Sequence, residues 1–139
     1  MAKTDKSLRV LVVDDNRDGA DALGLLVEEL GNQVHVTYGG TKALEVATTF
    51  RPDLILVDLS MPDLDGCCLV KRFRQIPAFA HTRIVAITGH ADEGHQILAM
   101  KAGFDRVLLK PLALTEIRAV LVADASQASR LAVERVCEV

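Results

Sequence analysis

Apolar residues recur along this chain in five short runs, each bounded by polar, glycine or proline residues. The runs cover residues 8–13, 34–37, 54–57, 81–87 and 107–109. Short runs that are apolar almost throughout and rich in β-branched residues are typical of strands buried on both faces of a parallel sheet. The run at 54–57 is bounded by Pro52 and by the turn at 60–62, and we predict that it forms a central strand.

The segments between these runs carry apolar residues at helical spacing. In the first segment, the glycine at position 31 marks the end of a helix; its apolar face would consist of Ala20, Leu23, Val27 and Leu30. Four further helices are predicted over residues 41–49, from 64 to before Pro77, over 91–102, and from about 113 onward. The apolar members of the fourth helix are Ile97, Leu98 and Met100, and those of the fifth are Leu114, Ile117, Val120 and Leu121.

Five strands alternating with five helices through short connections predict one α/β domain. Such alternation produces a parallel sheet covered by helices on both faces and joined by right-handed crossovers. We divide the chain into a polar leader (1–7), the domain (8–123) and a C-terminal helical extension (124–139). The extension either continues the last helix, which we prefer, or begins a separate helix capped by Asp124.

The amino-acid composition argues against nucleic-acid binding and against a membrane-spanning protein. Sixteen Lys and Arg against nineteen Asp and Glu give a net charge of −3, and there are one Tyr, four Phe and no Trp. Without a basic face or an aromatic stacking platform, direct nucleic-acid binding is not expected. No apolar stretch approaches the roughly 20 residues that span a bilayer, and residues 1–7 lack an apolar export segment. We therefore predict a cytoplasmic protein with no membrane partner.

The cysteines and histidines do not form a metal-binding pattern. Cys67, Cys68 and Cys137 are odd in number and lack metal-ligand spacing, so we predict reduced thiols. Adjacent helical residues point in different directions, so at most one of Cys67 and Cys68 should face the core. The four histidines form no ligand motif, and no transition-metal site is expected.

Polar residues gather where the predicted strands end. Asp14 and Asp15 follow the first strand, Asp58 the third, Thr88 the fourth and Lys110 the fifth. Ligands of open parallel sheets bind outside the carboxyl ends of the strands, so neighbouring strands would bring these side chains together. Three crowded carboxylates repel one another unless a cation lies among them. A hard divalent ion with oxygen ligands, most plausibly Mg²⁺, would resolve this repulsion.

Such a site supports phosphoryl transfer to a carboxylate. Asp58 is the best candidate nucleophile because it is the single carboxylate on the central strand, and Asp14 and Asp15 would hold the metal. Lys110 would bind a phosphoryl oxygen as a point charge, and the Thr88 hydroxyl would donate to another. Each residue alone has an ordinary explanation as a strand-end, capping or solvated side chain. Their joint placement at four strand ends makes coincidence improbable.

Four sequence motifs together resemble the receiver domain of bacterial two-component response regulators. These are Val12-Val13-Asp14-Asp15-Asn16, the stretch from Asp58 to Gly66, Ile87-Thr88-Gly89 and Leu109-Lys110-Pro111, in order over about residues 8 to 123. The resemblance implies the flavodoxin-like, doubly wound strand order 2-1-3-4-5. It also implies that the chain is a signalling phosphoacceptor, which supports only its own phosphorylation and dephosphorylation, and is not an enzyme.

The resemblance assigns roles to the strand-end residues. Asp58 matches the phosphoacceptor, Asp15 the direct ligand of Mg²⁺ (or Mn²⁺), and Asp14 the neighbour that holds metal-bound water. Ser60 matches the position whose backbone carbonyl binds the ion. Thr88 matches the switch hydroxyl and Lys110 the phosphate-binding lysine, which a cis peptide bond joins to Pro111.

One position departs from the family pattern. The family usually has an aromatic residue three positions before the lysine, and Val107 stands there. Phosphorylation should still occur, but we expect a different relay and output surface. Phe104, three residues earlier, is the candidate substitute.

We therefore predict a phosphoacceptor that receives a phosphoryl group from a histidine kinase or a histidine phosphotransfer protein. Residues 124–139 are too few to fold alone, so the output is expected to be a partner protein, and we also consider a homodimer through the last helix. One alternative is a receiver excised from a hybrid histidine kinase in a phosphorelay. A less favoured alternative is an Asp-nucleophile phosphatase, because those enzymes place two carboxylates as Asp-x-Asp and position 16 here is Asn16. A phosphorylation-independent interaction domain is also disfavoured, since no acidic residue of the site is missing.

Overall fold

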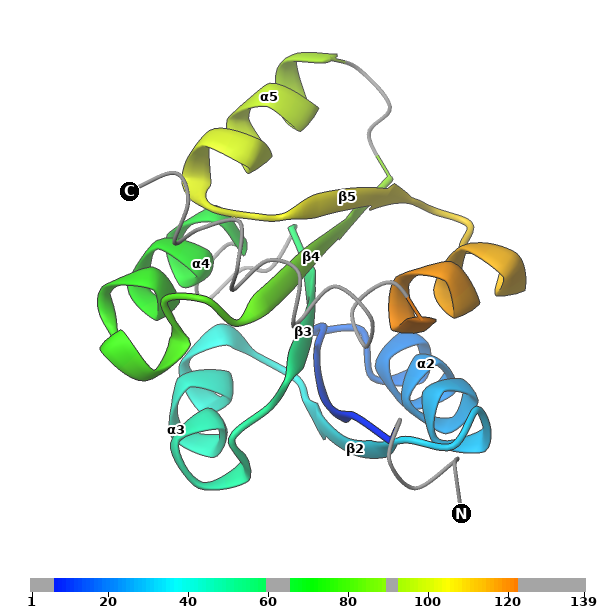
Figure 1. The fold of residues 1–139 in the computed structure, drawn as a ribbon. Coiled ribbons are helices and arrows are strands. Elements are labelled where there is room, and N and C mark those ends of the chain that lie inside the picture. Colours follow the sequence, from blue (N-terminus) through cyan, green and yellow to red (C-terminus); the bar gives the residue numbers. More distant parts are fainter. Residues whose placement is uncertain (1–6, 60–65, 90–92, 123–139) are drawn as a thin grey trace.

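A five-stranded parallel sheet forms the centre of the protein (Figure 1). The computed structural model describes residues 7–59, 66–89 and 93–122. The strands are β1 (Arg9–Val13), β2 (Gln33–Thr37), β3 (Leu54–Asp58), β4 (Arg83–Thr88) and β5 (Arg106–Leu109). Their order is β2-β1-β3-β4-β5, which confirms the predicted flavodoxin-like topology. β3 is buried along its whole length, as its apolar sequence predicts.

Helices cover both faces of the sheet (Figure 1). They are α2 (Arg17–Glu29), α3 (Gly40–Phe50), α4 (Gly66–Gln75), the 3-10 turn η1 (Pro77–Phe79), α5 (Glu93–Ala102) and the helical residues 114–122. One core lies between the sheet and α3, α4 and α5, and a second lies between the sheet, α2 and the helix at 114–122. The five predicted helices are therefore present.

Two local features bound α2, and the second of them, the glycine at position 31, was predicted from the sequence. The side chain of the N-cap residue Asn16 accepts a hydrogen bond from the backbone N–H of Gly19 at 3.1 Å, which satisfies one free donor of the first turn. Gly31 has φ of 100°, a conformation that glycine adopts without steric cost, and it follows the last turn of the helix.

The large apolar residues of α5 do not form its buried face. Ile97, Leu98 and Met100 are 52%, 64% and 49% exposed, whereas Ala99 and Ala102 are buried. The helix packs on the sheet core through small side chains, which allow a close approach, and its large apolar side chains point away. Sequence hydrophobicity favoured the large residues because it does not report which face meets the sheet.

Two smaller expectations also need correction. Leu114 is 44% exposed because it lies in the first turn of the last helix, and only Ile117, Val120 and Leu121 of the predicted set are buried. β4 begins at Arg83 rather than at residue 81, because residues 81 and 82 belong to the turn that follows η1.

Several other predictions can be compared with the structure only in part. Cys67 packs partly buried against the core, Cys68 is exposed and both are free thiols, as expected for adjacent helical positions. Cys137, most of the polar leader and the whole extension 124–139 lie outside the described residues. Across the described ranges, we find no helix with the length and apolar character needed to cross a bilayer.

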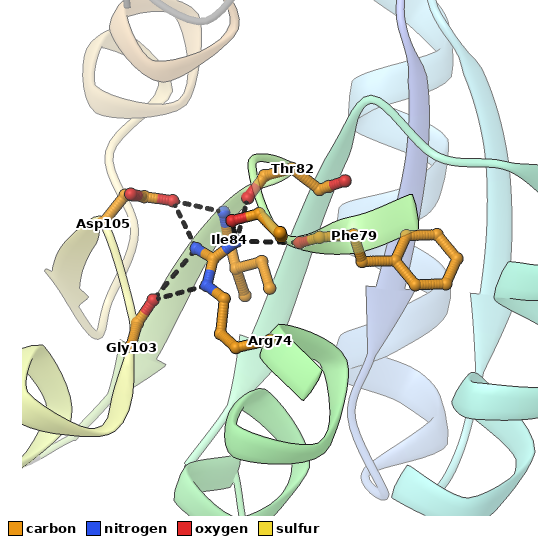
Figure 2. A network of polar contacts seen from close by, with 7 residues as sticks. Arg74, Phe79, Thr82, Ile84, Gly103 and Asp105 are labelled. Atoms are coloured by element: carbon orange, nitrogen blue, oxygen red, sulfur yellow. Dashed lines mark hydrogen bonds and ion pairs between the residues drawn. The ribbon is translucent and has the colours of Figure 1, made fainter. Parts of the chain in front are cut away.

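One arginine joins α4 to the beginnings of β4 and β5 (Figure 2). The Arg74 side chain is 19% exposed, and its guanidinium donates to the carboxylate of Asp105 at 2.8 Å. Asp105 Oδ2 also accepts from the backbone N–H of Ile84 at 2.9 Å. The other acceptors of Arg74 are the backbone carbonyls of Phe79, Ala80, Thr82 and Gly103, at 2.6–3.2 Å. This Arg74 network fixes the edge of the sheet where β4 and β5 start.

Candidate functional site

The sheet register brings the predicted strand-end residues to one edge. Val13 of β1 is paired with Val57 of β3, and the strand β3 ends on Asp58, which is paired with Ile87 of β4. Thr88, the last residue of β4, is paired with Leu109 of β5. Because all strands are parallel, the residues that follow them lie at the same carboxyl edge.

Three carboxylates meet at this edge and form what we call the acidic site, which consists of Asp14, Asp15 and Asp58. One carboxylate oxygen from each residue lies within 4.8 Å of the other two. Their exposure is graded: Asp58 is buried at 6%, Asp14 is partly buried and Asp15 is exposed. The acidic site is therefore open to solvent on the Asp15 side and closed by the sheet beneath Asp58.

The acidic site raises the pKa of Asp14 from its ordinary 3.8 to about 6. Burial is the largest cause, because it disfavours the charged form, and the nearby Asp58 carboxylate adds to it. A hydrogen bond from the backbone N–H of Asn16 to Asp14 Oδ1, at 3.0 Å, lowers the pKa, as does Lys110. The net effect is a raised pKa, in which burial outweighs the hydrogen bond from Asn16 and the charge of Lys110.

Lys110 contributes a positive charge from the opposite side. Its Nζ lies 3.5 Å from Asp58 Oδ2, and its side chain is 43% exposed whereas that of Asp58 is 7% exposed. The backbone N–H of Lys110 donates to the carbonyl of Thr88 at 2.8 Å, which aligns the two strand ends. The peptide bond from Lys110 to Pro111 is cis, as expected. Thr88 itself is buried at 1%.

Gly66 allows the chain to pass close behind Asp58. A Cβ at position 66 would lie 2.9 Å from the backbone oxygen of Asp58 and 2.9 Å from Cα of Leu59. Its backbone N–H also donates to the carbonyl of Leu59 at 3.1 Å. Only glycine fits this approach without displacing the backbone that carries Asp58.

The donor set suits a hard divalent cation. Three carboxylates supply oxygen ligands on one open side, which is the ligand type that Mg²⁺ and Mn²⁺ prefer. Burial and the neighbouring Asp58 carboxylate raise the pKa of Asp14, and a cation bound among the three carboxylates would favour its charged form. Ser60, which the family resemblance adds as a carbonyl ligand, lies outside the described residues.

Phe104 does not lie where a substitute for the missing aromatic residue would have to be. It is buried at 3% in the core and precedes the first residue of β5. Thr88 is paired with Leu109 at the other end of β5, so five residues of nearly extended chain, about 16 Å, separate the two positions along the strand. Val107 is partly buried against the core and is paired with Ala86.

Sequence analysis missed a group of three residues beside the acidic site. The Arg17 guanidinium carbon lies 4.1 Å from the centre of the Tyr38 ring. The Tyr38 hydroxyl donates to Asp21 Oδ1 at 2.5 Å. The only sequence signal was the i, i+4 spacing of Arg17 and Asp21 on one helix, and Tyr38 comes from another strand end.

Comparisons with known proteins agree with this arrangement. The sequence profile described as the response regulator receiver domain matches residues 10–131. The signal transduction histidine-protein kinase BarA of Escherichia coli K12 is 35% identical over 112 residues, which is 78% of this chain and 12% of the kinase. An uncharacterized 14.6 kDa protein of Leptolyngbya boryana is 34% identical over 103 residues, covering 74% of this chain and 79% of that protein.

A solved structure adds a metal-bound example. The receiver domain of the sensor histidine kinase PA1611 from Pseudomonas aeruginosa, which has a magnesium ion coordinated in its active-site cleft, is 27% identical with a TM-score of 0.80. The alignment covers 86% of this chain and 98% of that domain. Receiver domains are signalling modules rather than enzymes with separate substrates. With its profile match, its sheet order and its strand-end residues in agreement, this chain is a phosphoacceptor signalling module and belongs to the response regulator receiver domain family.

Proposed function

We propose that Asp58 accepts a phosphoryl group from a phosphohistidine donor in a reaction that depends on Mg²⁺ or Mn²⁺. The observation that carries the proposal is the buried Asp58 carboxylate, which has Lys110 at 3.5 Å and two further carboxylates within 4.8 Å. Asp58 is the last residue of β3, and its carboxylate lies close to Lys110 and to the other two carboxylates. It is therefore the carboxylate best placed to act as the nucleophile.

The other residues of the site would bind the divalent cation and neutralise the charge of the phosphoryl oxygens. Asp14, Asp15 and Asp58 would hold the divalent cation, with the backbone carbonyl of Ser60 as a further ligand by family resemblance. The cation, when bound, supplies positive charge to the oxygens of the phosphoryl group. The Lys110 ammonium would supply a second positive charge.

The transfer exchanges one bond for another. An oxygen of Asp58 forms a bond to phosphorus while the P–N bond of the donor imidazole breaks, and the imidazole keeps the electron pair of that bond. The Thr88 hydroxyl would then donate a hydrogen bond to the new phosphoryl group. Lys110, already 3.5 Å from Asp58, needs little movement to bind a phosphoryl oxygen.

The donor would be a histidine kinase or a histidine phosphotransfer protein in the cytoplasm, and the phosphorylated state would change the affinity for a downstream protein. Residues 8–123 would form the receiver and 124–139 a helical extension. A homodimer would form through the last helix. Val107 in place of the usual aromatic residue favours an output that differs from the common relay.

Intact-mass spectrometry after treatment with acetyl phosphate and Mg²⁺ tests the proposal. The wild-type chain should gain one phosphoryl group, and EDTA should suppress the gain. Asp58→Asn should remove it, whereas Asp53→Asn, which changes an exposed carboxylate at the other edge of the sheet, should not. An adduct of equal size on Asp58→Asn would place the nucleophile elsewhere.

A further inference from the structure

Arg17 is held in a defined position at the rim of the acidic site. It is the first residue of α2, two residues after Asp15, and it is exposed. Its guanidinium lies over the Tyr38 ring, with 4.1 Å from the guanidinium carbon to the ring centre, within the range of a cation–π interaction. Tyr38 is itself fixed, because its ring packs against the core on the α2 side and its hydroxyl bonds to Asp21.

The sheet register gives the place of Tyr38 relative to Asp58. Val13 is paired with both Thr37 and Val57, and the next residues along the three chains are Asp14, Tyr38 and Asp58. These three residues therefore lie at the carboxyl ends of adjacent strands, in the order Tyr38, Asp14, Asp58. The Asp14 N–H donates to the Thr37 carbonyl at 3.1 Å, which keeps this register beyond the strands. With a strand spacing of about 4.8 Å, the backbone of Tyr38 lies roughly 10 Å from that of Asp58.

The stacking leaves the hydrogen-bonding edge of the guanidinium accessible. A ring that covers one face does not use the in-plane N–H groups, which are the donors that bind a carboxylate in bidentate fashion. Among residues 7–59, 66–89 and 93–122, no hydrogen bond or ion pair occupies the Arg17 guanidinium. Arg17 is therefore a preoriented cation whose donors face solvent beside a phosphorylation site.

We propose that Arg17, positioned by Tyr38, docks a carboxylate of the protein that delivers the phosphoryl group to Asp58. This inference rests on the proposed function. The Arg17 guanidinium lies over a ring that follows β2, and β1 separates β2 from β3, which carries Asp58. A donor protein covers about 800 Å² of its partner and reaches well beyond Asp58. A guanidinium already held over a ring loses less conformational freedom on binding than a free side chain.

The surrounding charges make this contact selective. Asp15 and Asp18 are exposed on either side of Arg17. They repel an acidic partner whose carboxylate is displaced from Arg17. A donor whose carboxylate meets the guanidinium directly gains a charge-assisted bond, whereas a shifted donor meets like charge. Such a combination of attraction and repulsion discriminates between partners more than it adds affinity.

Tyr38 and Asp21 act as positioning residues in this arrangement. The hydrogen bond to Asp21 raises the pKa of Tyr38 above its ordinary 10.0, so its hydroxyl stays protonated and continues to donate. The ring face holds Arg17, so removing the ring should matter more than removing the hydroxyl.

The test compares a protein donor with a small donor. Autophosphorylated histidine kinases and phosphotransfer proteins of the source organism are screened, and the fastest donor is used at increasing concentration beside phosphoramidate with Mg²⁺. For Arg17→Gln we expect the half-saturating concentration of the protein donor to rise about tenfold, the effect of one charge-assisted hydrogen bond. The maximal rate should be retained. The matched control Arg72→Gln, an exposed arginine on α4, should leave the half-saturating concentration unchanged.

The small donor separates docking from chemistry. Because phosphoramidate has no carboxylate for Arg17 to bind, the ratio of protein-donor to phosphoramidate efficiency should fall for Arg17→Gln and not for Arg72→Gln. Equal losses with both donors would overturn the proposal, because Arg17 would then act on the chemistry at Asp58. Equal behaviour of Arg17→Gln and Arg72→Gln with the protein donor would also overturn it. If phosphoramidate labels the chain but no protein donor does, docking fails while phosphorylation of Asp58 stands.

Variants of Tyr38 test the positioning. Tyr38→Phe keeps the ring face and should retain most of the protein-donor efficiency. Tyr38→Leu should raise the half-saturating concentration of the protein donor about threefold and leave the maximal rate unchanged. General unfolding would instead lower the maximal rate. Equal efficiency of Tyr38→Leu and wild type would remove Tyr38 from the proposal.

Discussion

The Lys110 ammonium lies 3.5 Å from Oδ2 of Asp58, although 52 residues separate them in the chain. The parallel sheet brings them together, because each follows or ends a strand and β3 is joined to β5 through β4. Lys110 lies beside a buried carboxylate that two other carboxylates approach. Its charge therefore influences the whole acidic site.

Replacing Lys110 should change the titration of Asp14. In Lys110→Gln the pKa of Asp14 should rise above about 6, since Lys110 lowers it in the wild type. Phosphorylation by acetyl phosphate should slow by about 10- to 100-fold through loss of one charge at the developing phosphoryl oxygens. Carboxyl ¹³C NMR titration measures the first effect and intact mass over time the second. Lys101→Gln, an exposed change on α5, is the control, and an unmoved Asp14 titration would contradict this electrostatic account.

The stability of the metal-free protein should fall as pH rises from about 4 to about 6. In that interval the folded protein keeps a proton on Asp14 that the unfolded chain has lost, because the folded pKa is the higher one. Above about pH 6 the carboxylate is charged in both states and the loss is complete. Since Asp14 is only partly buried, Asp14→Asn should stabilise the metal-free protein at pH 7.5 by only about 1 kcal/mol. Urea unfolding at pH 5 and 7.5 measures this, and Asp18→Asn serves as the control.

The affinity for Mg²⁺ should depend on pH through the same Asp14 proton. Binding to the acidic site requires Asp14 to lose its proton, so the apparent affinity should fall about tenfold per pH unit below pH 6 and level off above it. Isothermal titration from pH 5 to pH 8 measures the affinity. In Asp14→Asn the affinity should be lower and this slope should disappear. A wild-type affinity that is constant over the whole range would show that Asp14 does not exchange its proton for the metal.

The close approach of Gly66 to the Asp58 backbone leads to a further prediction. Gly66→Ala should lower the free energy of unfolding by about 1–3 kcal/mol, because its Cβ would lie 2.9 Å from backbone atoms that cannot move independently of Asp58. The shift should also reduce Mg²⁺ affinity. Gly89→Ala is the matched control, since no atom lies within 4 Å of its added Cβ. Equal free energies of unfolding of the two variants in urea would show that the backbone near Asp58 can move to accommodate the Cβ without loss of stability.

The parts of the fold that were predictable depend on local patterns. Each buried strand is an apolar run, and the glycine at position 31 ends α2 as its sequence position indicates. The acidic site was also accessible from sequence, because Asp14, Asp58 and Lys110 are fixed by strand ends, and a parallel sheet aligns those ends. In both cases a local sequence pattern identifies a strand or its end, and the parallel sheet then determines where that residue lies.

The parts that were not predictable depend on orientation or on backbone acceptors. Ile97 and Leu98 are the large apolar residues of α5, but the helix packs through Ala99 because a small residue allows close contact with the sheet. The contact of Arg17 with Tyr38 joins a helix to a different strand end, and no sequence spacing reports it. The Arg74 network uses mostly carbonyl oxygens, which every residue possesses, so the sequence carries no sign of it.

The Arg74 network should be a major source of stability that does not affect the acidic site. Arg74→Met keeps the alkyl stem but leaves Asp105 and several partly buried carbonyls without their donor, so we expect a loss of about 2–4 kcal/mol. For a domain of this size that corresponds to a fall in Tm of roughly 5–15 °C by calorimetry. Arg72→Met, an exposed change on the same helix, should cost less than about 0.5 kcal/mol. Because the network lies where β4 and β5 begin and the acidic site lies where the strands end, Mg²⁺ affinity of folded Arg74→Met should equal that of the wild type. A loss of affinity matching the loss of stability would mean that the two edges of the sheet are coupled and that Arg74 positions the site as well as the fold.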